Sequence, residues 1–201
     1  MSNVTDKETE AIIIVFIKIN HKNDMKKLIL LMVLFLCGAF LFAQHDPYIQ
    51  QYLERLENSK KYLLVVAEAM PEDKYDYRVT PESMSFEEHL MHIAWAMDWH
   101  SQSLMGGRKR RDWNTETELK VGHKSKGEIM DKVAEIFDIT IKFIKEFESE
   151  RLGERLDYFG ANRTKMQILM ILSDHITHHR GQMLVSMRMN GLVPPRYVLF
   201  Q

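Results

Sequence analysis

The chain has 201 residues, of which 45% are hydrophobic and 27% are charged, and its formal net charge is −1. This balance of charge excludes a nucleic-acid binder that works through a basic surface, and the apolar content is too high for intrinsic disorder. The single cysteine, Cys37, can form neither an internal disulfide nor a cysteine-rich metal site.

The first predicted element in chain order is a secretory signal at residues 25–43. Lys26 and Lys27 provide a basic start, an apolar run of 16 residues extends from Leu28, and Ala43 supplies a small residue for cleavage. Because a membrane-spanning helix needs about 20 apolar residues, we interpret the run as a cleaved signal and not as an anchor. An uncleaved anchor is the alternative. We therefore expect a secreted or periplasmic protein with no stable membrane anchor after cleavage.

Residues 1–24 precede this signal, whereas a signal of this type normally begins a chain. We interpret residues 1–24 as a mis-called N-terminal extension, with translation starting at Met25. Residues 1–43 carry five of the 27 basic and four of the 28 acidic residues, which leaves 22 and 24 in the domain at 44–201, a net charge of −2. That domain has 158 residues and no cysteine, a length that suits a single packed core.

Four helices are predicted after the signal, because each has a recognisable start. Asp46 precedes Pro47, a capping residue before a proline at the first helical position. Capping boxes then open the other three helices, at Ser85–Glu88, Ser125–Glu128 and Thr164–Gln167.

Equally clear signals end these helices. Pro71 ends the first, Gly106-Gly107 the second, and Asn190-Gly191 the fourth. Apolar residues recur at 3-4 spacing within each segment, and no alternating strand pattern has comparable strength. The sequence therefore predicts an all-α protein that folds as a four-helix bundle.

Histidines are concentrated in two of these helices. Six of the eight histidines in residues 44–201 lie in the second and fourth predicted helices. His175 and His179 are four residues apart and so lie about 40° apart on one helix face, where both imidazoles can bind one metal ion. A pair of hydrogen-bonded core histidines is the alternative, because any buried imidazole needs a polar partner.

A third ligand would have to come from the second helix. Its candidates are His89, His92, His100 and Asp98. The helical wheel slightly favours His89 or His100, which lie closer to the apolar stripe, and it places His92 on the flank of that stripe. Geometry alone leaves this choice open.

Two segments carry a resemblance to a known family. SFEEHLMHIAWAMDW at 85–99 and DHITHHRGQMLVSMRMNGLVPPRY at 174–197 resemble the DinB-like family of metal-binding four-helix proteins, and the similarity covers about residues 47–200. Aligned by motif, the resemblance implies a metal triad of His92, His175 and His179. It also implies a homodimer.

The expected cofactor is a divalent transition metal, with zinc or nickel favoured, because three neutral imidazoles suit such ions and leave positions open for water or substrate. We expect a metal-dependent hydrolase with a small-molecule substrate, and no catalytic residue is assigned. The resemblance also implies thiol-dependent S-transferases, which the export signal disfavours because thiol cosubstrates are kept reduced inside the cell. A non-catalytic metal-binding or interaction module is the third hypothesis, since no clear general base accompanies the triad.

Three further features have alternative interpretations. Arg180 is either a contact for an anionic substrate or an exposed helix residue. Gly181 costs about 1 kcal/mol within a helix, which close approach of another helix or of substrate would explain. The basic cluster Arg108–Arg111 is either a solvated loop or an anion site.

Overall fold

The computed structural model describes residues 25–27, 29–30 and 46–197. The chain forms two units, residues 1–45 and residues 46–201. In the first unit, residues 25–27 and 29–30 are helical and exposed. Residues 1–24 and the remainder of the predicted signal lie outside the described residues. Within the described ranges, no helix has the length and apolar character needed to cross a bilayer.

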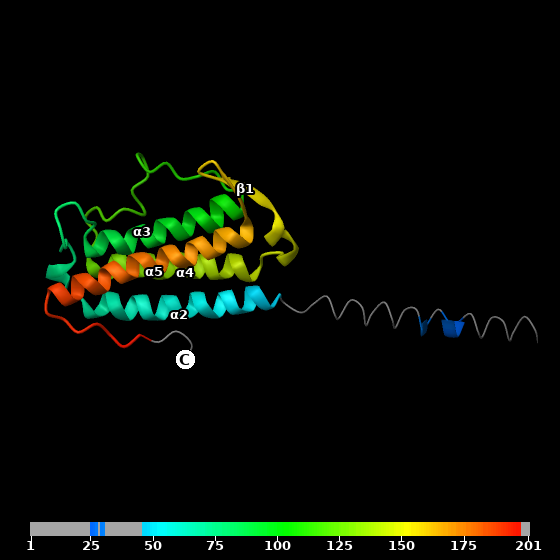
Figure 1. Cartoon of the computed structure of the whole chain (residues 1–201), viewed down its shortest axis with the longest axis horizontal. Coiled ribbons are helices and arrows are strands. Elements are labelled where there is room, and N and C mark those ends of the chain that lie inside the picture. Colours follow the sequence, from blue (N-terminus) through cyan, green and yellow to red (C-terminus); the bar gives the residue numbers. More distant parts are fainter. Residues whose placement is uncertain (1–24, 28, 31–45, 198–201) are drawn as a thin grey trace, which may run out of the picture. The chain divides into compact units, whose positions relative to one another are not determined.

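Four long helices build the second unit (Figure 1): α2 (Pro47–Ala69), α3 (Phe86–Asp98), α4 (Lys126–Lys145) and α5 (Lys165–Met189). The helix α3 continues as a π-helical segment, η2 (Trp99–Met105), which stops at Gly106. Two short 3₁₀ helices, η1 (Glu72–Lys74) and η3 (Ser149–Gly153), lie in the connections. The predicted four-helix bundle is confirmed.

The helix starts follow from local hydrogen bonds that the sequence predicted. The Ser85 hydroxyl accepts the Glu88 N–H at 3.2 Å, and the Glu88 carboxylate accepts the Ser85 N–H at 2.8 Å. The same reciprocal pairing opens α4 and α5, and the Asp46 carboxylate caps α2. These caps satisfy N–H groups that would otherwise lack partners in the first turn, and so they fix where each helix begins.

The helices are not arranged in simple sequential order. The helix α3 packs on α4 and α5, and α2 packs on the same two helices, so α2 and α3 lie diagonally across the bundle. The Tyr52 hydroxyl, near the N-terminus of α2, donates to the Leu169 carbonyl, near the N-terminus of α5. The helices α2 and α5 therefore run parallel. The side chains of Ser101, near the C-terminal end of the α3–η2 helix, and Thr140, near the C-terminal end of α4, are in contact. These two helices therefore also run parallel. The connection 106–125 therefore has to travel back along the bundle (Figure 1).

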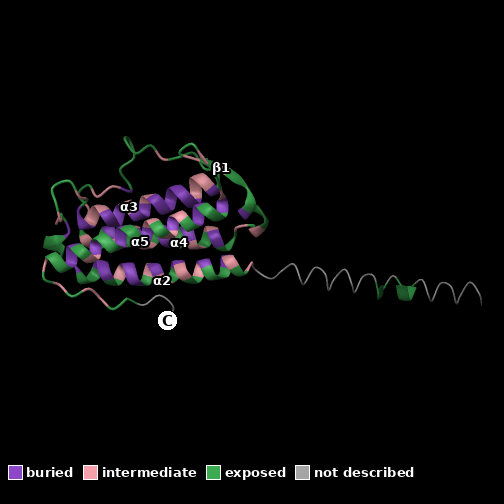
Figure 2. Cartoon of the chain, viewed as in Figure 1, coloured by how far each residue is buried: buried purple, intermediate pink, exposed green. Residues whose placement is uncertain are grey.

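Buried residues recur along all four long helices (Figure 2). Each helix contributes core side chains with essentially no exposed surface, among them Leu63, Phe86, Phe137 and Leu172. Burial of each such side chain contributes about 1.5–3 kcal/mol, so the core is the main source of stability. It also fixes the spacing of α3 and α5, between which the histidines lie.

One element was not predicted from the sequence. A hairpin pairs β1 (Arg155–Tyr158) with β2 (Ala161–Thr164), with Arg155 opposite Thr164 and Tyr158 opposite Ala161. Its two-residue turn has positive φ at both Phe159 and Gly160, as a type I′ turn requires. Strands of four residues are too short for an alternation of apolar and polar residues to stand out in the sequence. Gly160, which allows the tight turn, is therefore the main sequence signal for this hairpin.

Two interpretations of the fourth helix, an exposed Arg180 and a Gly181 that another helix approaches closely, were wrong. Arg180 is only 3% exposed, and its guanidinium lies between the rings of Tyr62 and Tyr197, 5.2 and 5.1 Å from their centroids. It therefore holds the C-terminal segment against α2 and is not an exposed helix residue. A Cβ placed on Gly181 would meet nothing within 4 Å, so no neighbouring helix requires glycine there.

Replacing Ser85 with alanine should lower the free energy of unfolding by about 1 kcal/mol, because α3 would lose the hydroxyl acceptor of its capping box. Urea unfolding monitored by circular dichroism measures the change. Ser85→Thr keeps a hydroxyl and should recover most of the loss. Equal stability of Ser85→Ala and the parent chain would show that the cap does not stabilise α3.

Candidate metal centre

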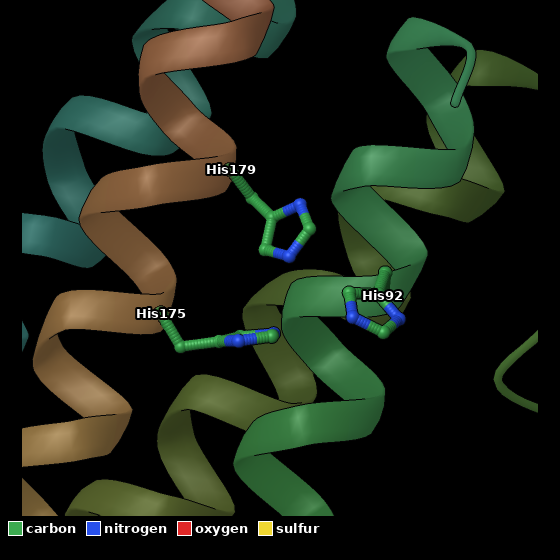
Figure 3. A group of neighbouring side chains, drawn as sticks. All are labelled: His92, His175 and His179. Atoms are coloured by element: carbon green, nitrogen blue, oxygen red, sulfur yellow. The ribbon is translucent and has the colours of Figure 1, made fainter. Parts of the chain in front are cut away.

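Three histidines from two helices come together in the bundle. His175 and His179 extend from α5 toward α3, and His92 meets them from α3 (Figure 3). One nitrogen from each ring can be chosen so that all three lie within 4.8 Å of one another. The ring centroids are 4.4 Å apart for His175–His179, 4.6 Å for His92–His179 and 4.9 Å for His92–His175. The residues that the family motif selected are thus brought together.

The surroundings of this cluster fit a metal ion. His179 is 8% exposed, and the Nε2 atom of His175 is buried with no hydrogen-bond partner among the described residues. An unpaired buried nitrogen is costly, and here it belongs to a group of three neutral donors of the kind that divalent transition metals prefer. A metal ion would supply the partner that the protein does not.

His89 is buried next to the cluster but is not part of it. Its Nδ1 lies 2.9 Å from the Nδ1 of His179, and it is 7% exposed. One of these two nitrogens must carry the proton. If His179 uses Nε2 as a ligand, its Nδ1–H donates to His89, which fixes both the tautomer and the orientation of the His179 ring.

His100 and Asp98, the other two candidates on this helix, have different partners. The Ala96 carbonyl lies 2.6 Å from Nδ1 of His100, so that nitrogen carries the proton, and Nε2 accepts the Tyr158 hydroxyl at 3.1 Å. Asp98 is 3% exposed and binds Arg108 and Arg111. The wheel therefore identified buried positions correctly, although burial did not show which side chain joins His175 and His179 in the cluster.

Sequence reasoning missed Tyr158. It lies on the unpredicted hairpin, and its ring stacks on Trp99 with centroids 5.7 Å apart. His100 in turn lies beside the cluster, its ring centroid 6.3 Å from that of His175. The hairpin thus brings a hydroxyl group into contact with His100, the ring next to His175.

The sequence of the chain is similar to those of known proteins. The sequence profile of the DinB family matches residues 42–200. The chain belongs to the DinB family. YjoA, an uncharacterized protein of Bacillus subtilis, is 26% identical over 133 residues, which is 63% of this chain and 80% of YjoA.

Solved structures of DinB-like proteins share the fold. The crystal structure of YjoA superposes with a TM-score of 0.59 at 22% identity, covering 76% of this chain and 96% of YjoA. A DinB-like protein of Bacillus cereus gives 0.58 at 23% identity, with coverages of 75% and 95%. YfiT of B. subtilis, described as a probable metal-dependent hydrolase with an unusual four-helix bundle topology, gives 0.59 at 12% identity, with coverages of 75% and 92%.

In this DinB-family domain the clustered imidazoles are held neutral. Burial, reinforced by the neighbouring histidines, lowers the pKa of His179 to about 3 and the pKa values of His175 and His89 to about 4. Burial also lowers the pKa values of His92 and His100. Neutral imidazole is the form that binds a metal ion, so the site is ready for one at neutral pH.

His92 connects the cluster to open space. It lines two adjoining pockets of about 370 and 380 Å³, which share Met84, His92 and Trp113. Glu88 lines the first of these pockets, but its carboxylate binds Arg78 and the Ser85 N–H. The Arg78 guanidinium, with the Ser85 N–H, lowers the pKa of Glu88, which makes it a weak base.

The metal-free domain should lose stability as the pH falls from 6.5 toward 4. The pKa values of the cluster in the folded protein lie below the ordinary 6.5, so the unfolded chain binds more protons across this window. Because solvent screens part of the effect, we expect a loss on the order of 1–2 kcal/mol between pH 7.5 and 5.

Urea unfolding of chelator-treated protein at the two pH values measures this loss. His123→Ala removes an exposed loop histidine and should leave the pH dependence unchanged. A free energy of unfolding that does not vary between the two pH values would contradict the neutral cluster.

Proposed function

We propose that this domain binds a divalent transition metal, zinc or nickel, through His92, His175 and His179 and acts as a metal-dependent hydrolase on a small-molecule substrate. The observation that carries the proposal is the convergence of three neutral imidazoles, one of which, His175, has a buried Nε2 with no hydrogen-bond partner in the described part of the chain. Three protein ligands leave coordination positions open, as catalytic sites do and closed structural sites do not.

The ion, when bound, supplies a Lewis acid that activates water at neutral pH. The protein residues orient the site and hold protons. His89 fixes the ring of His179 through their Nδ1 contact. The Tyr158 hydroxyl donates to Nε2 of His100, so this pair holds a proton beside the His175 ring.

YfiT, which shares this fold, is described as a probable metal-dependent hydrolase, and the proposal agrees with that description. An identity of 12%, however, supports a shared fold and not a shared activity. The assignment to hydrolysis therefore depends on the residues of this chain. The predicted export signal is a second support for hydrolysis. A hydrolase needs only water as its cosubstrate, and water is available outside the cell as well as inside it.

Two other functions compete with the proposed hydrolase. A thiol-dependent S-transferase would use the same three histidines to bind a thiol cosubstrate. A non-catalytic metal-binding module is favoured by one observation, namely that Glu88 is already engaged by Arg78 and the Ser85 N–H. The homodimer, and the absence of a nucleic-acid partner, stay predictions from the sequence.

The purified, untagged protein should contain about one equivalent of zinc or nickel by elemental analysis. His92→Ala, His175→Ala and His179→Ala should each lose most of it, because two imidazoles hold a divalent ion far more weakly than three. His178→Ala is the matched control, since His178 is exposed on the same helix and does not belong to the cluster.

Metal content that is unchanged in the three cluster variants would end the triad proposal. Hydrolysis is tested next, by screening the metal-loaded protein against ester, amide and lactone libraries. Activity that disappears in the cluster variants and persists in His178→Ala supports a hydrolase. Full metal loading with activity only when a thiol is added would favour the S-transferase.

We also propose that residues 25–43 direct export and are removed. N-terminal sequencing of the protein purified from its native source should begin at Gln44 and should show no residue upstream of Met25. A native protein that retains residues 1–24 would contradict both the start at Met25 and the cleaved signal.

A further inference from the structure

The pocket beside His92 has an aromatic wall that the metal proposal does not use. The rings follow one another along α3 and η2, with His92 stacked on Trp95 at 5.9 Å and Trp95 stacked on Trp99 at 5.5 Å between centroids. Trp113, from the connection 106–125, meets Trp95 edge-on at 5.5 Å. These three are the only tryptophans of the whole chain.

Trp113 is an unusual residue for a loop surface. Its side chain is 42% exposed, and with Met84, which is 36% exposed, it lines both pockets beside His92. Exposed indole surface costs free energy in water, and it favours a flat apolar ligand that would cover it. This wall therefore selects for a planar, apolar body.

A cation stands at the edge of the same pocket. The guanidinium of Arg110 lies 5.4 and 4.9 Å from the ring centroids of Trp95 and Trp99. Arg108 and Arg111 of the basic cluster are already engaged by carboxylates, Arg108 by Asp98 and Arg111 by Asp98, Glu116 and Glu118. In the part of the chain that the structure describes, Arg110 pairs with no carboxylate.

A second cation faces the adjoining pocket. The Lys120 ammonium lies 5.2 Å from the Trp113 ring centroid, and among the described ranges it too pairs with no carboxylate. The one carboxylate on that wall, Glu88, is neutralised by Arg78. The pocket is thus apolar in its walls and positive at its rim, which is the complement of an organic anion.

We propose that this pocket binds a small aromatic carboxylate, with the planar body against Trp113 and Met84 and the carboxylate on Arg110. A guanidinium binds a carboxylate through two parallel N–H donors, and stacking on Trp95 and Trp99 holds those donors in place. In terms of the proposed hydrolase, on which this inference rests, the substrate is an aromatic carboxylate that carries in addition a separate ester or amide bond, and this second bond reaches toward His92.

Tryptophan fluorescence tests the proposal directly, because two of the three indoles of the chain, Trp95 and Trp113, line the pocket and the third, Trp99, stacks on Trp95. Phenylacetate should change the emission saturably. Phenylacetamide, which lacks the charge, and acetate, which lacks the ring, should each bind about 10-fold more weakly or not at all. The metal is not required for these titrations, so they are run on both metal-loaded and chelator-treated protein.

The variant Arg110→Gln should weaken phenylacetate binding about 10-fold and remove the preference for phenylacetate over phenylacetamide. Lys109→Gln is the matched control, because it removes one positive charge from the same loop but lines neither pocket. Its affinity for phenylacetate should equal that of the parent chain. Unchanged urea unfolding of both variants shows that any loss does not come from misfolding.

A parent chain with no saturable response, or Arg110→Gln with undiminished affinity, would overturn the proposal. The two proposals can fail separately. Phenylacetate binding that depends on Arg110 in a protein that takes up no metal would end the hydrolase but leave this pocket assignment intact. Stoichiometric metal with no phenylacetate binding would end the substrate class alone.

Discussion

Imidazole rings buried between α3 and α5 impose the central constraint on this domain. A charged imidazole is costly in such a place, and a neutral one still has a lone pair and an N–H that need partners. The fold meets this need unevenly: His100 contacts the Ala96 carbonyl and the Tyr158 hydroxyl, and His179 contacts His89, whereas the buried Nε2 of His175 has no hydrogen-bond partner among the described residues. Two other buried side-chain atoms of the described residues, Ser103 Oγ and Arg180 Nη1, also lack a partner, but only the His175 nitrogen belongs to the histidine cluster.

The helices could be predicted from the sequence because the signals that start and end them are local. Ser85, Ser125 and Thr164 each form the reciprocal cap that their sequence spacing implied, and Gly106 ends the second helix as expected. Tyr158 could not be found in this way, since its role depends on a hairpin of four-residue strands and on contact with a residue 58 positions away. The π-helical turns of η2 likewise have no simple sequence pattern.

The choice among His89, His92 and His100 shows the limit of helical-wheel reasoning. The wheel ranks positions by closeness to the apolar stripe, and His89 and His100 are indeed 7% and 2% exposed. The side chain that joins His175 and His179 is instead the one on the flank, His92, which also lines the two pockets. The family motif contained this information, and periodicity alone did not.

The parallel course of α3 and α4 requires the long return connection 106–125, and that connection contributes Arg110 and Trp113 to the pocket wall. The three histidines, in contrast, are all held by helices. Surface loops accept insertions, deletions and substitutions more readily than packed helices do. Over evolutionary time the ligand preference of such a domain can therefore diverge by loop exchange while its chemical centre stays fixed, so that closely similar centres would serve dissimilar compounds.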